Sequence, residues 1–244
     1  MLSESKEIKG CYSKFQLPML DEPRTVRIRF CKTGSLQFIS HLDLQRTFHR
    51  ILVRAGIPMW YTKGFNPHAK LVFGAPLSVG TESMCEMADL KIERKITLDA
   101  IKEQLNAQLT NEMYVLEAYI PSMKFADIAY ADYTITVKTE KADDRLVKKI
   151  ERIFSSPVIM LKKTKSGESE VDITKFIKKI DTKLNGEDIV IKTLLSCGST
   201  ENLNPEYLIR AIRKECGILD ENKNCDSYRI MRNKFFTSSL EEFR

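Results

Sequence analysis

Several motifs that would assign a function directly are missing from this sequence. The six cysteines are scattered, so they provide neither the CxxxCxxC motif that binds an iron–sulfur cluster for radical chemistry nor the spacing of zinc ligands. The chain also lacks a phosphate-binding GxxxxGKS/T loop, a dinucleotide-binding GxGxxG loop and a GxSxG nucleophile elbow. We therefore expect no metal and no cofactor, and an enzyme that works alone with a nucleotide or a metal–sulfur centre is disfavoured.

Long apolar runs are missing as well. No stretch approaches the roughly 20 residues of a membrane span, and residues 1–20 lack the apolar region of a signal peptide. The chain has 244 residues, of which 43% are hydrophobic and 30% charged, so it can bury a core without disulfides or metals. We expect a cytoplasmic globular protein of one or two domains that has no membrane partner.

Acidic residues are scarce in one part of the chain. The whole sequence has 39 Lys and Arg against 33 Asp and Glu, a net charge of +6. Between residues 22 and 74, nine basic residues face only two acidic ones, which is a net +7. A concentrated excess of this kind is typical of a protein that binds a polyanion, and a solvated basic face is the plainer alternative.

Hydrophobic periodicity predicts two similar halves. Apolar and basic residues alternate from Val26 to Cys31 as in a half-buried strand, and apolar residues at helical spacing follow from 44 to 55. Further strands are expected at 59–62, 69–73, 84–92 and 113–119, and a second helix begins after Thr97. The second half repeats this order around an inserted polar loop at 162–170.

This element order is that of the ferredoxin-like βαββαβ unit. We therefore expect an α+β fold of two tandem ferredoxin-like domains with mainly antiparallel sheets. The expected boundaries are an N-terminal tail at 1–21, a first domain at 22–121, a linker at 122–132 and a second domain at 133–244.

Chemically versatile side chains gather between residues 27 and 80, where all three histidines lie. His41 is expected in the first turn of a helix, where free backbone N–H groups and the helix dipole favour an anion. The segment 63–70 combines Gly, Pro, amide, imidazole, ammonium and aromatic groups. It could hold phosphates through Lys63 and Lys70, and stack a base on Phe65 or on the nearby Trp60 and Tyr61. The predicted nucleic-acid-binding residues are Arg27, Arg29, Lys32, His41, Arg46, Lys63, Phe65, Asn66, His68 and Lys70.

Each of these residues also has a purely structural interpretation. His41 could extend a helix-capping network, and Asp43 could complete a capping box with Ser40. Phe65 and Trp60 have the residue types of a hydrophobic core. The remaining histidine, His49, is expected to be a half-exposed helix residue. The loop at 63–70 is the hardest to interpret structurally, because a simple connector needs few different polar groups.

The segment from Val26 to Arg46, VRIRFCKTGSLQFISHLDLQR, resembles the opening of a bacterial radical-SAM-linked domain of unknown function. The residues GFNPH at 64–68, with Lys70 and the segment 76–80, resemble the second signature of that family, and residues 171–177 and 198–205 resemble its later motifs. Ala69 departs from the proline expected in relatives. The resemblance implies a radical SAM protein as partner and a setting among ribosomal proteins and a ribonuclease, but no reaction.

A second resemblance, at the level of the fold, is to the tandem ferredoxin-like RAMP proteins that process RNA. It implies a catalytic alternative in which His41 and His68 act as acid and base, because histidine titrates near neutral pH. The glycine-rich loop of those enzymes is missing, since residues 216–225 contain only Gly217.

Three hypotheses remain for the function. The first is an RNA-binding or substrate-presenting accessory protein of a radical SAM enzyme, with Arg27, Arg29 and Lys32 among its phosphate contacts. The second is an RNA-processing enzyme that uses His41 and His68. The third is a protein–protein adaptor whose basic face meets an acidic partner.

Overall fold

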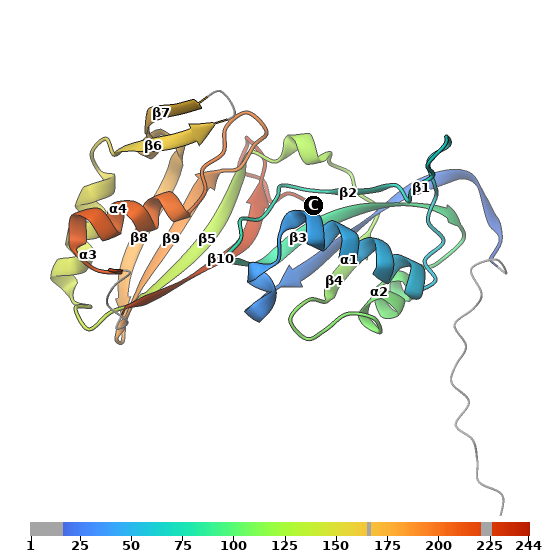
Figure 1. Ribbon diagram of the computed structural model, residues 1–244, viewed down its shortest axis with the longest axis horizontal. Coiled ribbons are helices and arrows are strands. Elements are labelled where there is room, and N and C mark those ends of the chain that lie inside the picture. The colour runs from blue at the N-terminus through green and yellow to red at the C-terminus, as the bar shows by residue number, and fades with distance from the viewer. Residues whose placement is uncertain (1–16, 165–166, 221–225) are drawn as a thin grey trace, which may run out of the picture. The chain divides into compact units, whose positions relative to one another are not determined.

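The computed structural model describes residues 17–164, 167–220 and 226–244, which form four α-helices and ten β-strands (Figure 1). The strand pairings are mainly antiparallel, so the predicted α+β class with mainly antiparallel sheets is confirmed. None of the helices in these ranges is long and apolar enough to cross a membrane.

Contacts divide the chain into two compact units. Unit 1 contains the described residues up to Phe30, together with His41–Gly74 and Met87–Pro121. Unit 2 contains Ser122–Arg244, together with the two short segments Cys31–Ser40 and Ala75–Glu86. Unit 1 therefore ends near the predicted linker, but two pieces of the first half pack with the second half, which the sequence analysis did not anticipate.

The strands and helices of unit 1 alternate along the chain. They are β1 (Met19–Lys32), α1 (His41–Arg54), β2 (Leu71–Phe73), β3 (Thr81–Arg94), α2 (Leu98–Asn106) and β4 (Val115–Tyr119). The strand order is β4-β1-β3, and β2 pairs with β3 in the antiparallel sense. The final residues of β1 and the first residues of β3 belong to unit 2.

An aromatic cluster forms part of the core of unit 1. Val26, Ile28 and Phe30 of β1 are fully buried, as their alternation with polar residues predicts. The ring of Phe30 lies 4.8 Å from that of Phe48 on α1, and Phe73 packs edge-on against both rings. The apolar face of α1 is thus held against the strands, which leaves its opposite face exposed to solvent.

Unit 2 has the same kind of element order with one insertion. Its elements are β5 (Tyr130–Lys138), α3 (Asp144–Phe154), β6 (Ile159–Thr164), β7 (Gly167–Asp172), β8 (Ile177–Asn185), β9 (Asp188–Ser196), α4 (Glu206–Cys216) and β10 (Ser227–Phe236). The main strands are antiparallel in the order β10-β5-β9-β8. Helices α3 and α4 lie side by side in Figure 1, and Gly217 ends α4 with a positive φ of 64°.

Three local predictions are wrong. The expected polar loop at 162–170 is largely a hairpin of β6 and β7, because a run of polar residues does not exclude a strand with one face in solvent. Residues 36–39, predicted to continue in an extended conformation after a turn at 33–34, instead lie at the end of a 3₁₀ helix that spans Gly34–Phe38. The strand expected at 59–62 is reduced to isolated bridges, Met59 with Ile92 and Tyr61 with Ala69.

Strand β3 takes part in both units because of its length. Its C-terminal half pairs with β2 in unit 1. Its first residues belong to unit 2, where Thr81–Ser83 pair with Ile230–Arg232 of β10 in the parallel sense. The segment Ala75–Glu86 is thereby fixed to the sheet of unit 2.

Candidate nucleic-acid interface

The segment 62–68 of unit 1 is a loop with a fixed base. The bridge between Tyr61 and Ala69 brings its two ends together. The backbone N–H of Thr62 donates to the carbonyl of His68 at 2.9 Å, and the N–H of His68 donates back to the Thr62 hydroxyl at 3.1 Å. The loop can therefore present its side chains from a defined position, as binding loops on rigid scaffolds do.

Half of the predicted contact residues lie on this loop or just after it. Lys63, Phe65, Asn66, His68 and Lys70 are all exposed. Phe65 is fully exposed, so its interpretation as a core residue is wrong. An exposed aromatic ring among cations is the arrangement that stacks a base and holds the adjoining phosphates.

The aromatic residues that precede the loop are less available. Trp60 is only partly exposed, and the ammonium of Lys91 lies 4.9 Å from its ring centroid, a cation–π contact. Tyr61 is partly exposed beside the loop. Phe65 is thus the freest aromatic ring of the three.

Two hollows lie along helix α1, both within unit 1, and the smaller one also borders the loop. The smaller one, of 210 Å³, has both His49 and His68 in its wall and Leu52, Met59 and Ala69 among its apolar residues. The larger one, of 630 Å³, is lined by Thr47, His49, Arg50, Val53 and Arg54. Sequence reasoning assigned His49 no function. His49 precedes the exposed Val53 by four residues, so both lie on the solvent face of α1, and this spacing could have indicated that His49 is accessible to a ligand.

His41 is the first residue of α1, as expected, but it lies apart from His68. Its ring packs edge-on against Phe73, with centroids 5.5 Å apart, and its Nε2 lies 3.0 Å from Nε2 of Gln45. Eight residues of helix separate His41 from His49, which is about 12 Å along the axis. The pocket therefore joins His68 with His49, not with His41 as the catalytic alternative requires. Arg46 is exposed and forms a 3.4 Å ion pair with Asp43.

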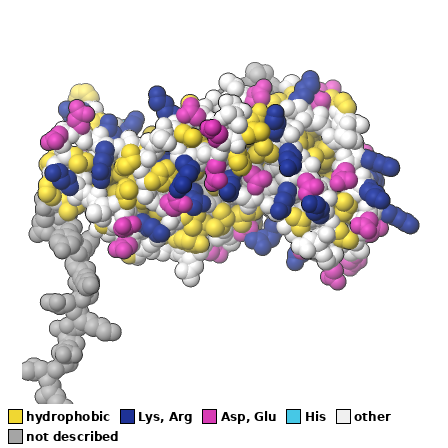
Figure 2. Space-filling model, turned by 180° about the vertical axis from the view of Figure 1, so that it is seen from behind, with side chains coloured by type: hydrophobic (Ala, Val, Ile, Leu, Met, Phe, Trp, Pro, Cys, Tyr) yellow, Lys and Arg dark blue, Asp and Glu magenta, His cyan; other side chains and the backbone are white. Residues whose placement is uncertain are grey.

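The three residues of β1 predicted to contact phosphates, Arg27, Arg29 and Lys32, are not free on the surface. Arg27 is 1% exposed, and its Nε and Nη2 donate to the two carboxylate oxygens of Asp89 at 2.7 and 2.9 Å. Arg29 is half-buried and forms an ion pair with Glu117. Lys32 is 2% exposed in unit 2. Contact of Arg27 or Lys32 with a phosphate would require these residues to be uncovered. On the face that Figure 2 presents, basic and acidic side chains are interspersed.

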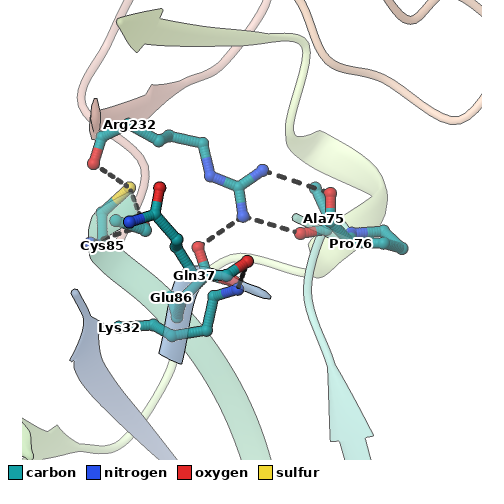
Figure 3. Close-up of polar contacts among 8 residues, drawn as sticks. Lys32, Gln37, Ala75, Pro76, Cys85, Glu86 and Arg232 are labelled. Atoms are coloured by element: carbon teal, nitrogen blue, oxygen red, sulfur yellow. Dashed lines mark hydrogen bonds and ion pairs between the residues drawn. The ribbon is translucent and has the colours of Figure 1, made fainter. Parts of the chain in front are cut away.

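Lys32 belongs to a buried group of charges in unit 2, which we call the charge cluster: Lys32, Glu86 and Arg232 (Figure 3). Arg232 of β10 is 1% exposed, and its Nη2 donates to the carboxylate of Glu86 at 2.5 Å and to the carbonyl of Ala75 at 3.0 Å. The ammonium of Lys32 donates to the carbonyl of Gln37 at 3.3 Å. The bonds of Arg232 fasten the segment Ala75–Glu86 to β10, whereas the bond of Lys32 lies within the segment Cys31–Ser40.

The environment of the charge cluster shifts several pKa values. Burial lowers the pKa of Lys32, the carboxylate of Glu86 opposes this shift, and Arg232 adds to it. Burial lowers the pKa of Arg232, but the combined electrostatic effect of Glu86, Tyr133, Cys197 and Cys85, to which Glu86 contributes most, raises it overall. Burial also raises the pKa of the Cys85 thiol to about 12 and that of the Tyr133 phenol. Near neutral pH this thiol stays protonated, so it is a poor nucleophile.

The variant Lys32→Met tests the lowered pKa of Lys32. In the unfolded chain a lysine titrates near its ordinary pKa of about 10.4. Between the lowered folded pKa and that value, the unfolded chain binds more protons than the folded one, so the lysine's contribution to stability rises with pH. The contributions of Cys85 and Tyr133 to stability fall as pH rises, because the pKa values of both groups are raised in the folded protein.

The measurement is therefore the difference in unfolding free energy between wild type and Lys32→Met. Denaturant titrations from about pH 7 to about pH 10 would give it, and we expect the difference to move in favour of the wild type as pH rises. A difference that stays constant over this range would show that Lys32 titrates as an ordinary surface lysine.

Comparison with known proteins gives one family match. Residues 25–205 match the sequence model of a family described as "Uncharacterized protein conserved in bacteria (DUF2344)". No curated protein matches the chain. One solved structure with some likeness is a chain of a Cbf5-Nop10-Gar1 complex, at 9% identity and a TM-score of 0.45, covering 86% of this chain and 48% of that one. This chain thus spans about half the length of that protein.

Another solved structure is that of an unknown protein from Galdieria sulphuraria, at 8% identity and a TM-score of 0.25, covering 86% of this chain and 99% of that one. Neither TM-score reaches the level at which a fold is shared.

Proposed function

The chain belongs to the uncharacterized bacterial family DUF2344, and we propose that it binds single-stranded RNA through unit 1 and presents that RNA to a radical SAM enzyme. The observation that carries the proposal is the fully exposed ring of Phe65 on a loop with a fixed base. An exposed aromatic ring on a positioned loop can stack on a nucleobase, because every base has a flat π face.

The cations around Phe65 support a nucleic acid as that partner. Lys63 and Lys70 are exposed on the loop, and Arg50 and Arg54 are exposed on α1. We call these four side chains, together with Phe65, the loop–helix surface. A flexible single strand can place successive bases and phosphates on such a surface, whereas a duplex keeps its bases stacked.

The radical SAM partner rests on the family resemblance of the motifs at 26–46 and 64–80. The sequence of this chain contains no CxxxCxxC motif, so the radical chemistry would be supplied by the partner. In this proposal Arg27 and Lys32 stabilise the fold instead of contacting phosphates, because both are buried.

We also propose that each unit is a ferredoxin-like βαββαβ fold. The support is the strand order: β4-β1-β3-β2 in unit 1 and β10-β5-β9-β8 in unit 2 place corresponding strands in the same sequence, once the hairpin β6–β7 is set aside. In this fold the first and third strands are antiparallel neighbours at the centre of the sheet, as β5 and β9 are in unit 2, and the second strand lies at the sheet edge. An experimental structure with a different strand order in either unit would overturn the assignment.

The variant Phe65→Ala tests the stacking contact. We expect it to weaken binding of a single-stranded RNA between about 5-fold and 150-fold, since stacking one base on an aromatic ring is worth about 1–3 kcal/mol. Fluorescence anisotropy with a labelled oligonucleotide measures this. Phe38→Ala is the matched control, because Phe38 is 66% exposed but belongs to unit 2. Equal losses in both variants, or no RNA binding by the wild type, would contradict the proposal.

A further inference from the structure

We propose that the 210 Å³ pocket beside α1 binds one unstacked base of the RNA strand, so that unit 1 contacts bases as well as phosphates. We call it the base pocket. This inference rests on the proposed RNA binding and assigns a site to one nucleotide. The base pocket lies wholly in unit 1, between α1 and the bridged segments that lead into and out of the loop.

The walls of the base pocket suit a flat heterocycle. Its inner part is apolar, with Leu52 of α1, Ile57, Met59 and Ala69, all of them buried. Its outer part carries three ring side chains that have polar atoms: His49, Tyr61 and His68. A flipped base needs apolar contact for its faces and hydrogen-bonding groups for its edge, and both are present here. The volume equals that of about seven waters at roughly 30 Å³ each, which suits one small ring system better than a drug-sized ligand.

The imidazole of His68 is held in place before any ligand arrives. Its Nδ1 lies 3.2 Å from the hydroxyl of Thr62 and 3.3 Å from the carbonyl of Asn66. These contacts engage Nδ1 and leave Nε2 as the ring nitrogen available to a ligand. Among the described residues, neither Nε2 of His68 nor the ring of His49 has a hydrogen-bond partner. The Nε2 of His68 and the ring of His49, which face the same pocket, can each provide a donor or an acceptor to a base edge.

The surroundings of the base pocket favour a nucleotide within a strand. His49 and Val53 line both this pocket and the larger 630 Å³ hollow, so the two are neighbours on α1. Arg50 and Arg54 line that hollow, where they can meet the phosphates on either side of the inserted base. Phe65 is then free to stack a different base. A strand bound in this way alternates stacking, insertion and phosphate contacts along one face of unit 1.

The test compares two strands of equal length in proteins that carry Phe65→Ala. One strand is oligouridine, and the other is an abasic ribose-phosphate oligomer with the same phosphates and no bases. With the stacking ring removed, any remaining preference for oligouridine reports another base contact. We expect such a preference to persist, and we expect His68→Ala to lower oligouridine affinity about fivefold, the value of one lost hydrogen bond. Abasic-strand affinity should stay within about twofold.

The variant His49→Ala tests the pocket independently of the loop, because it leaves the loop contacts of His68 intact. Ala69→Leu, which fills the pocket, should also abolish the preference for bases, and thermal unfolding would verify that this variant folds. Two results would contradict the base pocket but not the proposed RNA binding. One is that Phe65→Ala alone removes the preference for oligouridine over the abasic strand. The other is that each histidine variant lowers affinity for both strands equally. Failure of the wild type to bind either strand would instead overturn the proposed function.

Discussion

Replacing Glu86 by alanine is expected to lower the unfolding free energy by about 3–5 kcal/mol, because it leaves the guanidinium of Arg232 buried without its counter-charge. Arg232 is 1% exposed, and among its other partners the carbonyls of Ala75 and Pro76 accept hydrogen bonds from its guanidinium. Carbonyl oxygens accept its hydrogen bonds but cannot neutralise its charge. The substitution should also loosen the segment Ala75–Glu86, which these bonds fasten to β10.

Denaturant unfolding of the variants measures this effect. Glu117→Ala is the matched control, since Glu117 forms an ion pair with Arg29 in which both side chains are about one-third exposed. We expect this control to lose no more than about 1 kcal/mol, the usual value of a solvated pair. The double variant Glu86→Leu with Arg232→Met should recover much of the lost stability, because it removes the uncompensated charge. Equal destabilisation by Glu86→Ala and Glu117→Ala would contradict a stabilising role for the charge cluster.

Reversing the charge of both loop lysines, in the variant Lys63→Glu with Lys70→Glu, is expected to weaken single-stranded RNA binding on the order of 100-fold at low salt. Each reversal replaces an attraction to phosphate by a repulsion. The slope of log affinity against log salt should become shallower by about 1.4, because each phosphate that is no longer neutralised on a single strand accounts for roughly 0.7. Both quantities come from one titration series repeated at several salt concentrations.

The control for this prediction must change the net charge equally. Lys183→Glu with Lys192→Glu does so in unit 2, where both lysines are exposed on β8 and β9. If RNA binding depends on the loop–helix surface, this control should lose little affinity and keep its salt slope. Similar losses of affinity in both double variants would show that RNA responds only to the overall charge of the protein.

Much of the fold could be predicted because its signals are local. Leu44, Phe48, Ile51 and Leu52 recur at the spacing of one helix face, and all four are buried on α1. The pairing of β3 with β10 had no such signal. It joins residues about 150 positions apart, Thr81 with Ile230, and long-range pairing leaves no periodicity in either strand.

The candidate site could be predicted in part, because some of its residues are close together in the sequence. The loop at 63–70 was identified from its composition, and it does present five of the ten predicted residues together. Arg27 and Lys32 were misleading because alternation along a strand indicates which residues share a face, not what covers that face. Asp89 and Glu86, which lie beside these two residues, come from β3, more than 50 positions along the chain. The approach of His49 to His68 likewise depends on tertiary packing.

The most direct test of the central claim is ultraviolet crosslinking of this protein to RNA in its native cells, followed by mass spectrometry of the crosslinked peptides. We predict crosslinks within residues 60–70, with Phe65 among the modified positions, and we predict that a radical SAM protein is recovered with the same RNA. Crosslinks confined to unit 2 would contradict the loop–helix surface. A radical SAM protein recovered equally well after ribonuclease treatment, with no crosslinked RNA, would identify the chain as a protein adaptor and would contradict the proposed presentation of RNA.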